Sequence, residues 1–204
     1  QLYKRALGIS ERALGPDHPN VAIGLSNLAN LYRERGKFDE ALPLYKRALA
    51  IYEQTLGPNH PNISDSLHNL AVLYGTQGKY NEALALLQRA LTIHEHTLGL
   101  NHPNVANDLN TLGLYYSEQG KYDEALLLHK RALTIREHAL GPNHPDVAAN
   151  LHPLGLLYHA KGRYNEALAL LQRALTIYER TLGQKHPDTE LCRRNLKACQ
   201  KSIR

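Results

Sequence analysis

The chain has 204 residues, of which 43% are hydrophobic and 21% are charged. This composition is ordinary for a folded protein and excludes a long disordered tail. No apolar run approaches the roughly 18–20 residues that span a bilayer, so we expect no membrane-spanning segment and no membrane partner. The sequence starts with Gln rather than Met and shows no signal-peptide core. We expect a cytoplasmic protein, and a secretion signal in a segment upstream of these residues is the alternative.

The positive charge of the chain is concentrated at one end. The formal net charge is +5, but residues 185–204 carry six basic and two acidic side chains, which leaves the rest close to neutral. A basic terminal helix is most simply a solvated end of the molecule, and an anionic partner at that end is the alternative.

A unit of 42 residues repeats along the whole chain. Its clearest marker is a His-Pro pair, found at His18-Pro19, His60-Pro61, His102-Pro103, His144-Pro145 and His186-Pro187. A glycine marks the middle of each unit, at Gly36, Gly78, Gly120 and Gly162. The letters from Tyr80 to Ile93 recur unchanged from Tyr164 to Ile177. Self-similarity at a fixed period predicts an array of stacked structural units.

Each unit predicts two helices, A and B. Helix A begins at the proline of the His-Pro pair, because proline suits the first helical position. Its apolar residues have the spacing i, i+3, i+4, i+7 of one helix face, as in Leu25, Leu28, Ala29 and Tyr32. Helix A ends at the middle glycine, which suits a left-handed cap. We expect helix B to be capped by the polar residue three positions later, namely Asp39, Asn81, Asp123 and Asn165.

One helix pair cannot bury its own apolar faces, so neighbouring pairs must stack. The sequence therefore predicts an all-α solenoid of about ten helices in antiparallel pairs. We expect it to form a single array, with a partial repeat (helix B) over 1–15, full repeats over 16–57, 58–99, 100–141 and 142–183, and a capping helix over 184–204. The first residues align with the middle of helix B, so we expect the chain to be part of a longer array. In the capping helix, Arg193 and Lys197 replace apolar or small residues of the other units, as a polar end face requires.

Several short motifs recur in this framework, namely Leu25-x-x-Leu28-Ala29-x-x-Tyr32, Gly36-x-Phe38, Ala41, Ala48-Leu49 and Leu56-Gly57-Pro58-Asn59-His60-Pro61. In these motifs the chain resembles the tetratricopeptide repeat in its 42-residue kinesin-light-chain form. The resemblance implies a right-handed superhelix whose A helices line a concave groove. It also implies that an extended peptide or a partner protein binds in that groove. Relatives of this kind favour short segments in which Trp is flanked by acidic residues.

The candidate binding residues lie on the face of helix A that points away from helix B. Relatives use asparagine at the positions of Asn27 and Asn69 to hold a ligand backbone, and an amide can both donate and accept. Thr111 and Pro153 depart from that pattern, and Pro153 should also kink its helix. The full set of predicted peptide-binding residues is Asn27, Asn30, Arg33, His68, Asn69, Val72, Asn110, Thr111, Leu114, His152, Leu156 and His159. The alternative is that these polar side chains are merely solvated.

The sequence offers little for catalysis or metal binding. Of its twelve histidines, five belong to the His-Pro pairs, and we expect each of these to cap its own helix. His129 replaces an apolar residue and is interpreted as a core histidine with a partner. Cys192 and Cys199 lie about 10 Å apart on one helix face, too far for a disulfide, and are interpreted as packing residues. No nucleophile elbow, phosphate-binding loop or zinc-protease motif occurs, so we expect no enzyme, no catalytic residue, no metal and no cofactor.

Two functions remain after these exclusions. The first is a scaffold that binds an extended peptide or a protein in the groove of the A helices. The second is a structural spacer or self-assembling rod that grows end to end through the open N-terminal half-repeat. Nucleic acid is not an expected partner, because the net charge of the chain before residue 185 is close to zero and its tyrosines occupy core positions.

Overall fold

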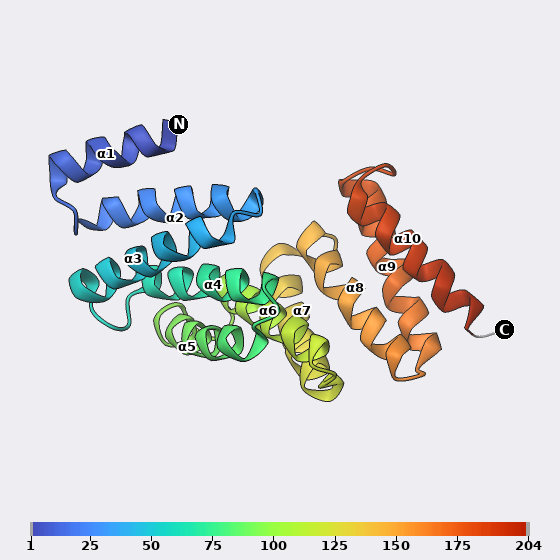
Figure 1. Cartoon of the computed structure of the whole chain (residues 1–204). Helices are drawn as coiled ribbons and strands as arrows, with labels where there is room; N and C mark the ends of the chain where they lie inside the picture. The colour runs from blue at the N-terminus through green and yellow to red at the C-terminus, as the bar shows by residue number, and fades with distance from the viewer. Residues whose placement is uncertain (1, 203–204) are drawn as a thin grey trace. The chain divides into compact units, whose positions relative to one another are not determined.

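The computed structural model describes residues 2–202 of the chain. Across these residues every regular element is an α-helix (Figure 1), which confirms the all-α prediction. The ten helices are α1 (Leu2–Leu14), α2 (Pro19–Glu34), α3 (Phe38–Leu56), α4 (Pro61–Thr76), α5 (Tyr80–Leu98), α6 (Pro103–Glu118), α7 (Tyr122–Leu140), α8 (Pro145–Ala160), α9 (Tyr164–Thr181) and α10 (Pro187–Lys201). Arg204, counted above in the basic end, lies outside the described residues.

The chain divides into two compact units, residues 1–100 (unit 1) and residues 101–204 (unit 2). Unit 1 contains α1 and the helix pairs α2–α3 and α4–α5, and unit 2 contains the pairs α6–α7 and α8–α9 followed by α10. We call α2, α4, α6 and α8 the A helices and α3, α5, α7 and α9 the B helices. Within each unit, consecutive helices pack side by side, and successive A helices also touch. Among the described residues no helix has the length and apolarity needed to cross a membrane.

The five linker histidines cap the helices that follow them. In each, the ring Nδ1 accepts a hydrogen bond from the backbone N–H two residues later, over 3.1 to 3.3 Å. The proline that follows each histidine occupies the first helical turn, where a backbone N–H would have no partner within the helix. These caps are made by His18, His60, His102, His144 and His186. The local role predicted for these histidines is confirmed.

The turn from helix A to helix B depends on a glycine in the left-handed region. Gly36 has φ +70°, and its N–H donates to the carbonyl of Arg33 over 2.9 Å. The N–H of Lys37 donates to the carbonyl of Tyr32 over 2.8 Å. These two bonds form a Schellman motif, which only glycine enters without strain at this position. The same pair of bonds recurs after α4, α6 and α8.

This turn explains why the predicted caps of helix B are wrong. Helix α3 already begins at Phe38, its N-cap is Lys37, and no side chain caps it. The same holds for α5, α7 and α9. The predicted caps Asp39, Asn81, Asp123 and Asn165 lie inside the first helical turn. There the aspartates favour the positive end of the helix dipole. Helix α8 continues through Pro153 to Ala160 as one helix, and the kink expected at this residue stays a prediction.

Small residues let helix A approach helix B closely. Ala41 and Ala48 on α3 are fully buried, as is Ala29 on α2. In unit 2 the position of Ala29 is taken by Gly113 and Gly155. The large apolar side chains of both helices interlock around these contacts into the core of each unit.

Arg–Glu pairs join successive B-type helices. Distances from guanidinium nitrogen to carboxylate oxygen are 2.6 to 2.7 Å in Arg47–Glu11, Arg89–Glu53 and Arg173–Glu137. The repeated arginines Arg47, Arg89 and Arg173 therefore have a structural role. Glu179 of α9 pairs instead with Arg193 of α10, over 2.6 Å. This gives the unusual arginine of the last helix a structural partner.

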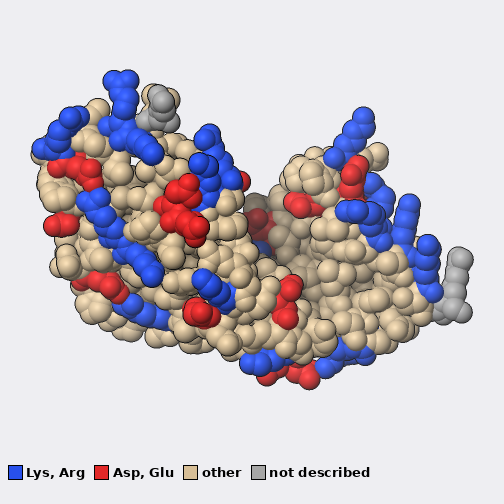
Figure 2. Space-filling view, in the orientation of Figure 1, with Lys and Arg blue, Asp and Glu red and all other residues tan. Residues whose placement is uncertain are grey.

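Helix α10 covers α9 with its two cysteines and exposes a basic face. Cys192 and Cys199 are buried and unbonded to one another. Burial raises the pKa of the Cys192 thiol to about 11. Both are packing residues, as predicted. The opposite face of α10 carries Arg194 and Lys197, and Figure 2 shows Lys and Arg side chains gathered over this helix.

Replacing Gly155 with Ala should destabilise the protein by about 1–3 kcal/mol, because the helices cannot separate to admit a methyl group. A Cβ at this position would lie 2.8 Å from Cγ of Leu171. Chemical denaturation followed by circular dichroism measures the effect. The matched control is Gly8→Ala, since a Cβ on Gly8 meets nothing within 4 Å. We expect that control to be neutral or stabilising, and equal effects of the two changes would contradict the packing argument.

Candidate functional site

In unit 1 a hollow of about 240 Å³ opens between the A helices α2 and α4. We call it the α2–α4 hollow. It is lined by Ile23, Ser26, Asn27, Tyr52, Asn62, Asp65, Ser66 and Asn69. Both asparagines predicted to hold a ligand backbone, Asn27 and Asn69, are thus placed on its wall. Neither side-chain amide has a hydrogen-bond partner within the described part of the chain, so both can pair with a ligand.

The wall of the α2–α4 hollow combines a buried phenol with a carboxylate. Tyr52 comes from α3 and is 5% exposed. Burial raises its pKa, and the negative charge of Asp65 raises it further. The Asp65 side chain is 58% exposed, and one of its oxygens lies 3.4 Å from Nε2 of the buried His94. The hollow therefore carries negative charge on a wall that is otherwise uncharged.

The remaining predicted residues of unit 1 lie along the same two A helices. Asn30 is half-buried, and its side-chain oxygen accepts a hydrogen bond from the hydroxyl of Tyr45 over 2.5 Å. Arg33, His68 and Val72 are also half-buried. The oxygen of Asn30 therefore has a structural partner, which the sequence did not reveal.

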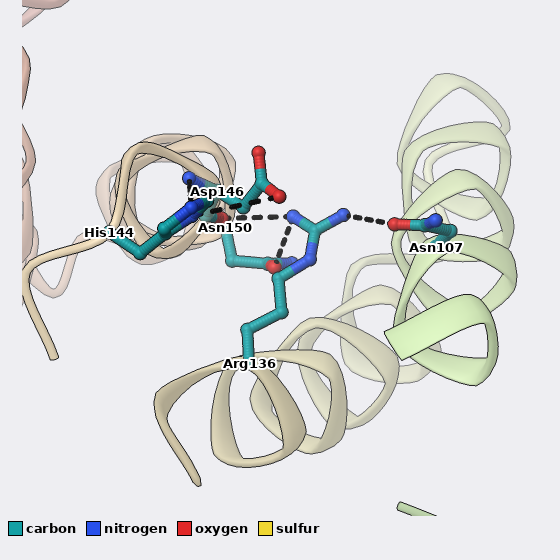
Figure 3. A network of polar contacts seen from close by, with 5 residues as sticks. All are labelled: Asn107, Arg136, His144, Asp146 and Asn150. Carbon is teal, nitrogen blue, oxygen red and sulfur yellow. Dashed lines mark hydrogen bonds and ion pairs between the residues drawn. The ribbon is translucent and has the colours of Figure 1, made fainter. Parts of the chain in front are cut away.

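In unit 2 the space between α6 and α8 is occupied by the guanidinium of Arg136, which reaches there from α7 (Figure 3). Arg136 is 7% exposed. Its Nη1 donates to the carbonyl of Asp146 over 2.9 Å and to the side chain of Asn150 over 2.6 Å. Its Nη2 donates to the side-chain oxygen of Asn107 over 2.7 Å. Burial lowers the pKa of Arg136 from its ordinary 12.5, and these three acceptors compensate the buried charge.

The network around Arg136 continues into the core. Nδ2 of Asn150 donates to Oδ1 of Asn110 over 2.7 Å, and Nδ1 of His129 lies 3.1 Å from the same oxygen. His129 is 1% exposed, and burial, followed by the charge of Arg136, lowers its pKa to about 4. The neutral ring therefore donates from Nδ1, which confirms the interpretation of His129 as a core histidine. Asn110, predicted to contact a ligand, uses its side-chain oxygen inside the network.

The A helices of unit 2 expose large apolar side chains, as α2 of unit 1 does with Ile23. Leu114 is 44% exposed and Leu156 is 39% exposed. Leu156 lines a hollow of about 380 Å³ together with Ser117, Glu118, Tyr122, Leu157 and Ala160. The hydroxyl of Thr111 donates to the backbone carbonyl of Asn107 over 3.0 Å, so it mainly satisfies its own helix.

The two histidines predicted to face a ligand from α8 contact α10 instead. His152 is 9% exposed, and its Nε2 lies 2.8 Å from Nδ2 of Asn195. Nε2 of His159 lies 3.0 Å from the hydroxyl of Ser202, and its ring stands edge-on to Tyr164. The expected exposure of His152 is therefore wrong, because the next helix in the stack covers it. His159 keeps part of its surface exposed.

Among the described residues, no group of three His, Cys, Asp or Glu side chains lies close enough to hold a metal ion. His129 and Arg136, whose pKa values are lowered by burial, lie inside a hydrogen-bonded network of unit 2. What the exposed surfaces offer is hydrogen bonding and apolar contact, which is the chemistry of binding.

Comparison with known proteins identifies the class. The tetratricopeptide repeat family model matches residues 1–54, 21–95, 76–138, 128–180 and 146–203. The chain therefore belongs to the tetratricopeptide repeat family, and its repeats form a solenoid of that type. None of the curated proteins matches the chain.

Its structural neighbours are kinesin light chain-like repeat proteins, as the 42-residue repeat predicted. One is the crystal structure of a Podosopora anserina protein described as a kinesin light chain with nearly identical TPR-like repeats. It shares 30% identity at a TM-score of 0.76 and covers 91% of this chain and 88% of that one. A single-residue variant of that protein matches this chain with a TM-score of 0.77. Another is BtubC (BKLC) from P. vanneervenii, with 30% identity, a TM-score of 0.78 and coverage of 91% and 74%. Proteins with this repeat are typically scaffolds rather than enzymes.

One position that shapes both units was missed in the sequence. Tyr52, His94, Arg136 and Tyr178 occupy it in the four full repeats. Tyr52 has the helical spacing of a core residue on helix B, four positions after Ala48, and this spacing hides the role of the position. The sequence does contain a signal for this position. Its residue type changes between Tyr, His and Arg from repeat to repeat, while the alanines of the same helix stay the same.

Mild acid should destabilise unit 2 through His129. Its pKa is about 4 in the folded protein and ordinarily 6.5. The unfolded chain therefore binds the proton more readily, and stability falls as pH drops below 6.5. Between pH 6.5 and pH 5 the loss is about 2 kcal/mol. His129→Leu should remove this component, since Leu171 fills the equivalent position against Gly155. Urea denaturation at several pH values measures it, and an unchanged pH dependence in the variant would contradict the assignment.

Proposed function

We propose that the chain is a scaffold that docks an extended peptide, or an extended segment of a partner protein, along the exposed faces of its A helices. Its tetratricopeptide repeats and kinesin light chain-like neighbours support a protein-interaction role. The observation that carries the proposal is the α2–α4 hollow, with the unpaired amides of Asn27 and Asn69 on its wall.

The chemistry of this surface suits an extended chain. A peptide without regular structure presents unpaired backbone N–H and C=O groups. Removing these groups from water costs free energy unless they find new hydrogen-bond partners. A side-chain amide supplies one acceptor and two N–H donors, so one asparagine can satisfy both kinds of group. In unit 2 the exposed Leu114 and Leu156 provide apolar contact for ligand side chains.

A self-assembling rod is the second candidate, and one observation favours it. Tyr3 and Ile9 on α1 are 49% and 56% exposed, whereas the equivalent Tyr45 and Ile51 on α3 are 1% and 2% exposed. This apolar face could accept another helix. However, Lys4, Arg5 and Arg12 line a hollow on α1, and the exposed face of α10 is also basic (Figure 2). Stacking α1 of one copy on α10 of another would bring like charges together, which is unfavourable.

Asn69→Ala should weaken peptide binding about tenfold without unfolding the protein, because it removes hydrogen bonds to the ligand backbone. The chain has no Trp, so a library of Trp-containing peptides reports binding by its own fluorescence. The matched control is Asn165→Ala, an exposed asparagine in the first turn of α9. We expect wild-type affinity from the control. Equal affinity of wild type and Asn69→Ala would remove this residue from the site.

Light scattering should show a particle mass that does not depend on concentration, because the basic faces of α1 and α10 repel one another. The experiment is run at low and at high salt, since screening weakens that repulsion. Growth of the particles at low salt, together with silence across the peptide library, would favour the rod over the scaffold.

A further inference from the structure

The α2–α4 hollow of unit 1 and the site of Arg136 in unit 2 are equivalent places in the repeat. A shift of 84 residues, two repeats, superimposes their positions. It pairs Tyr52 with Arg136, the residue that each B helix sends between two A helices. The three acceptors of Arg136 likewise correspond to residues that line the hollow: Asn107 to Ile23, Asp146 to Asn62, and Asn150 to Ser66.

Unit 2 therefore shows what this place in the fold can hold. There a guanidinium lies between two A helices, bound by one backbone carbonyl and two side-chain amides (Figure 3). The occupant comes from the chain itself. A charge that is 93% removed from solvent remains stable only because each of these acceptors faces it.

Unit 1 keeps acceptors but has no guanidinium of its own at this place. Tyr52 stands where unit 2 has Arg136, and a hollow of about 240 Å³ remains. Its wall includes the carboxylate of Asp65, at the position of Ala149, and the hydroxyl of Ser66, at the position of Asn150. No Lys or Arg is among the lining residues. The wall thus carries a negative charge at a position where unit 2 has Ala149, and in unit 2 the carboxylate of Asp146 raises the pKa of Arg136 against the effect of burial.

We propose that the α2–α4 hollow binds the guanidinium of an arginine side chain supplied by the docked peptide, and that Asp65 determines this specificity. The proposal rests on the proposed function, since the arginine belongs to the peptide that the scaffold holds. Asp65 and Ser66 accept hydrogen bonds from the guanidinium, while Asn27 and Asn69 on the same wall pair with the peptide backbone.

The neighbour of Asp65 is compatible with this role. Nε2 of His94 lies 3.4 Å from one oxygen of Asp65. When the imidazole is neutral, the pair keeps a charge of −1, and the carboxylate has further acceptor sites for a ligand. An acidic peptide residue at this place would meet Asp65 and be repelled. Unit 1 should therefore select a basic residue where the family resemblance implied acidic ones.

The test uses N-acetyl-argininamide as the probe and N-acetyl-citrullinamide as its neutral isostere. Both are titrated into the full ¹⁵N-labelled chain, and amide shifts are followed by NMR. We expect saturable shifts at Asn62, Asp65 and Asn69 with the arginine probe and none with citrulline. Asp65→Asn, which keeps size and an acceptor but removes the charge, should weaken the response about tenfold. The matched control Asp39→Asn, on α3 outside the hollow, should bind as the wild type does.

A second variant tests occupancy rather than charge. Tyr52→Arg copies the residue found in unit 2 and should fill the hollow from within, so that the probe response in unit 1 disappears while the helical circular dichroism is unchanged. Equal shifts with arginine and citrulline, or an unchanged response in Asp65→Asn, would overturn the proposal. So would probe binding that persists in Tyr52→Arg.

The outcome separates this inference from the proposed function. Peptides that lose affinity in Asn69→Ala but show no preference for arginine, and no effect of Asp65→Asn, would leave the scaffold intact and reject the guanidinium site. Arginine-probe binding that depends on Asp65, without any peptide bound through Asn69, would support the cation site and reject the peptide groove.

Discussion

The close contact between each A helix and its own B helix is the interaction on which the rest of the structure depends. Fully buried alanines on the B helices, and alanine or glycine opposite them, hold every pair at a short distance. Because these small residues repeat, each pair has nearly the same geometry. A given position in the repeat therefore has nearly the same surroundings in every pair. A different residue at that position decides whether the space between two A helices is filled or open.

The position shared by Tyr52 and Arg136 shows the consequence. A buried polar group must find partners, so the arginine in unit 2 is accompanied by Asn107, Asn110 and Asn150. These amides replace Ile23, Ser26 and Ser66 of the equivalent pair in unit 1. Tyr52 in unit 1 carries no charge and needs fewer polar partners than an arginine, and the space beside it stays open. One buried substitution, with its matching neighbours, thus separates a filled core from a hollow able to accept a ligand.

The fold could be predicted closely from the sequence, because its signals are local. His-Pro pairs and left-handed glycines mark where helices begin and end, and their geometry depends on residues within one turn. The error at Asp39 has the same origin. The backbone bonds of the Schellman motif place Lys37 at the N-cap, and a spacing argument alone did not show where that motif ends.

The candidate site was predicted less completely, because its contacts are not local. Asn27 and Asn69 both line the α2–α4 hollow, as helical periodicity alone can indicate, and their contact with a ligand stays a prediction. Asn110 and His152 also lie on A helices, but their partners come from the next helix on the same side of the stack. Asn110 pairs with Asn150 of α8, 40 residues later, and His152 pairs with Asn195 of α10, 43 residues later. Periodicity within one helix cannot show that a neighbouring helix has covered a side chain.

The most direct test of this account is to locate a bound peptide on the protein. A peptide selected from the library, carrying a nitroxide spin label at one end, would be added to the ¹⁵N-labelled chain, and paramagnetic broadening of the amides would be measured by NMR. The account predicts that broadening is confined to the exposed faces of the A helices and is strong around Asn27 and Asn69. Broadening centred on the B helices, or on the basic face of α10, would contradict it.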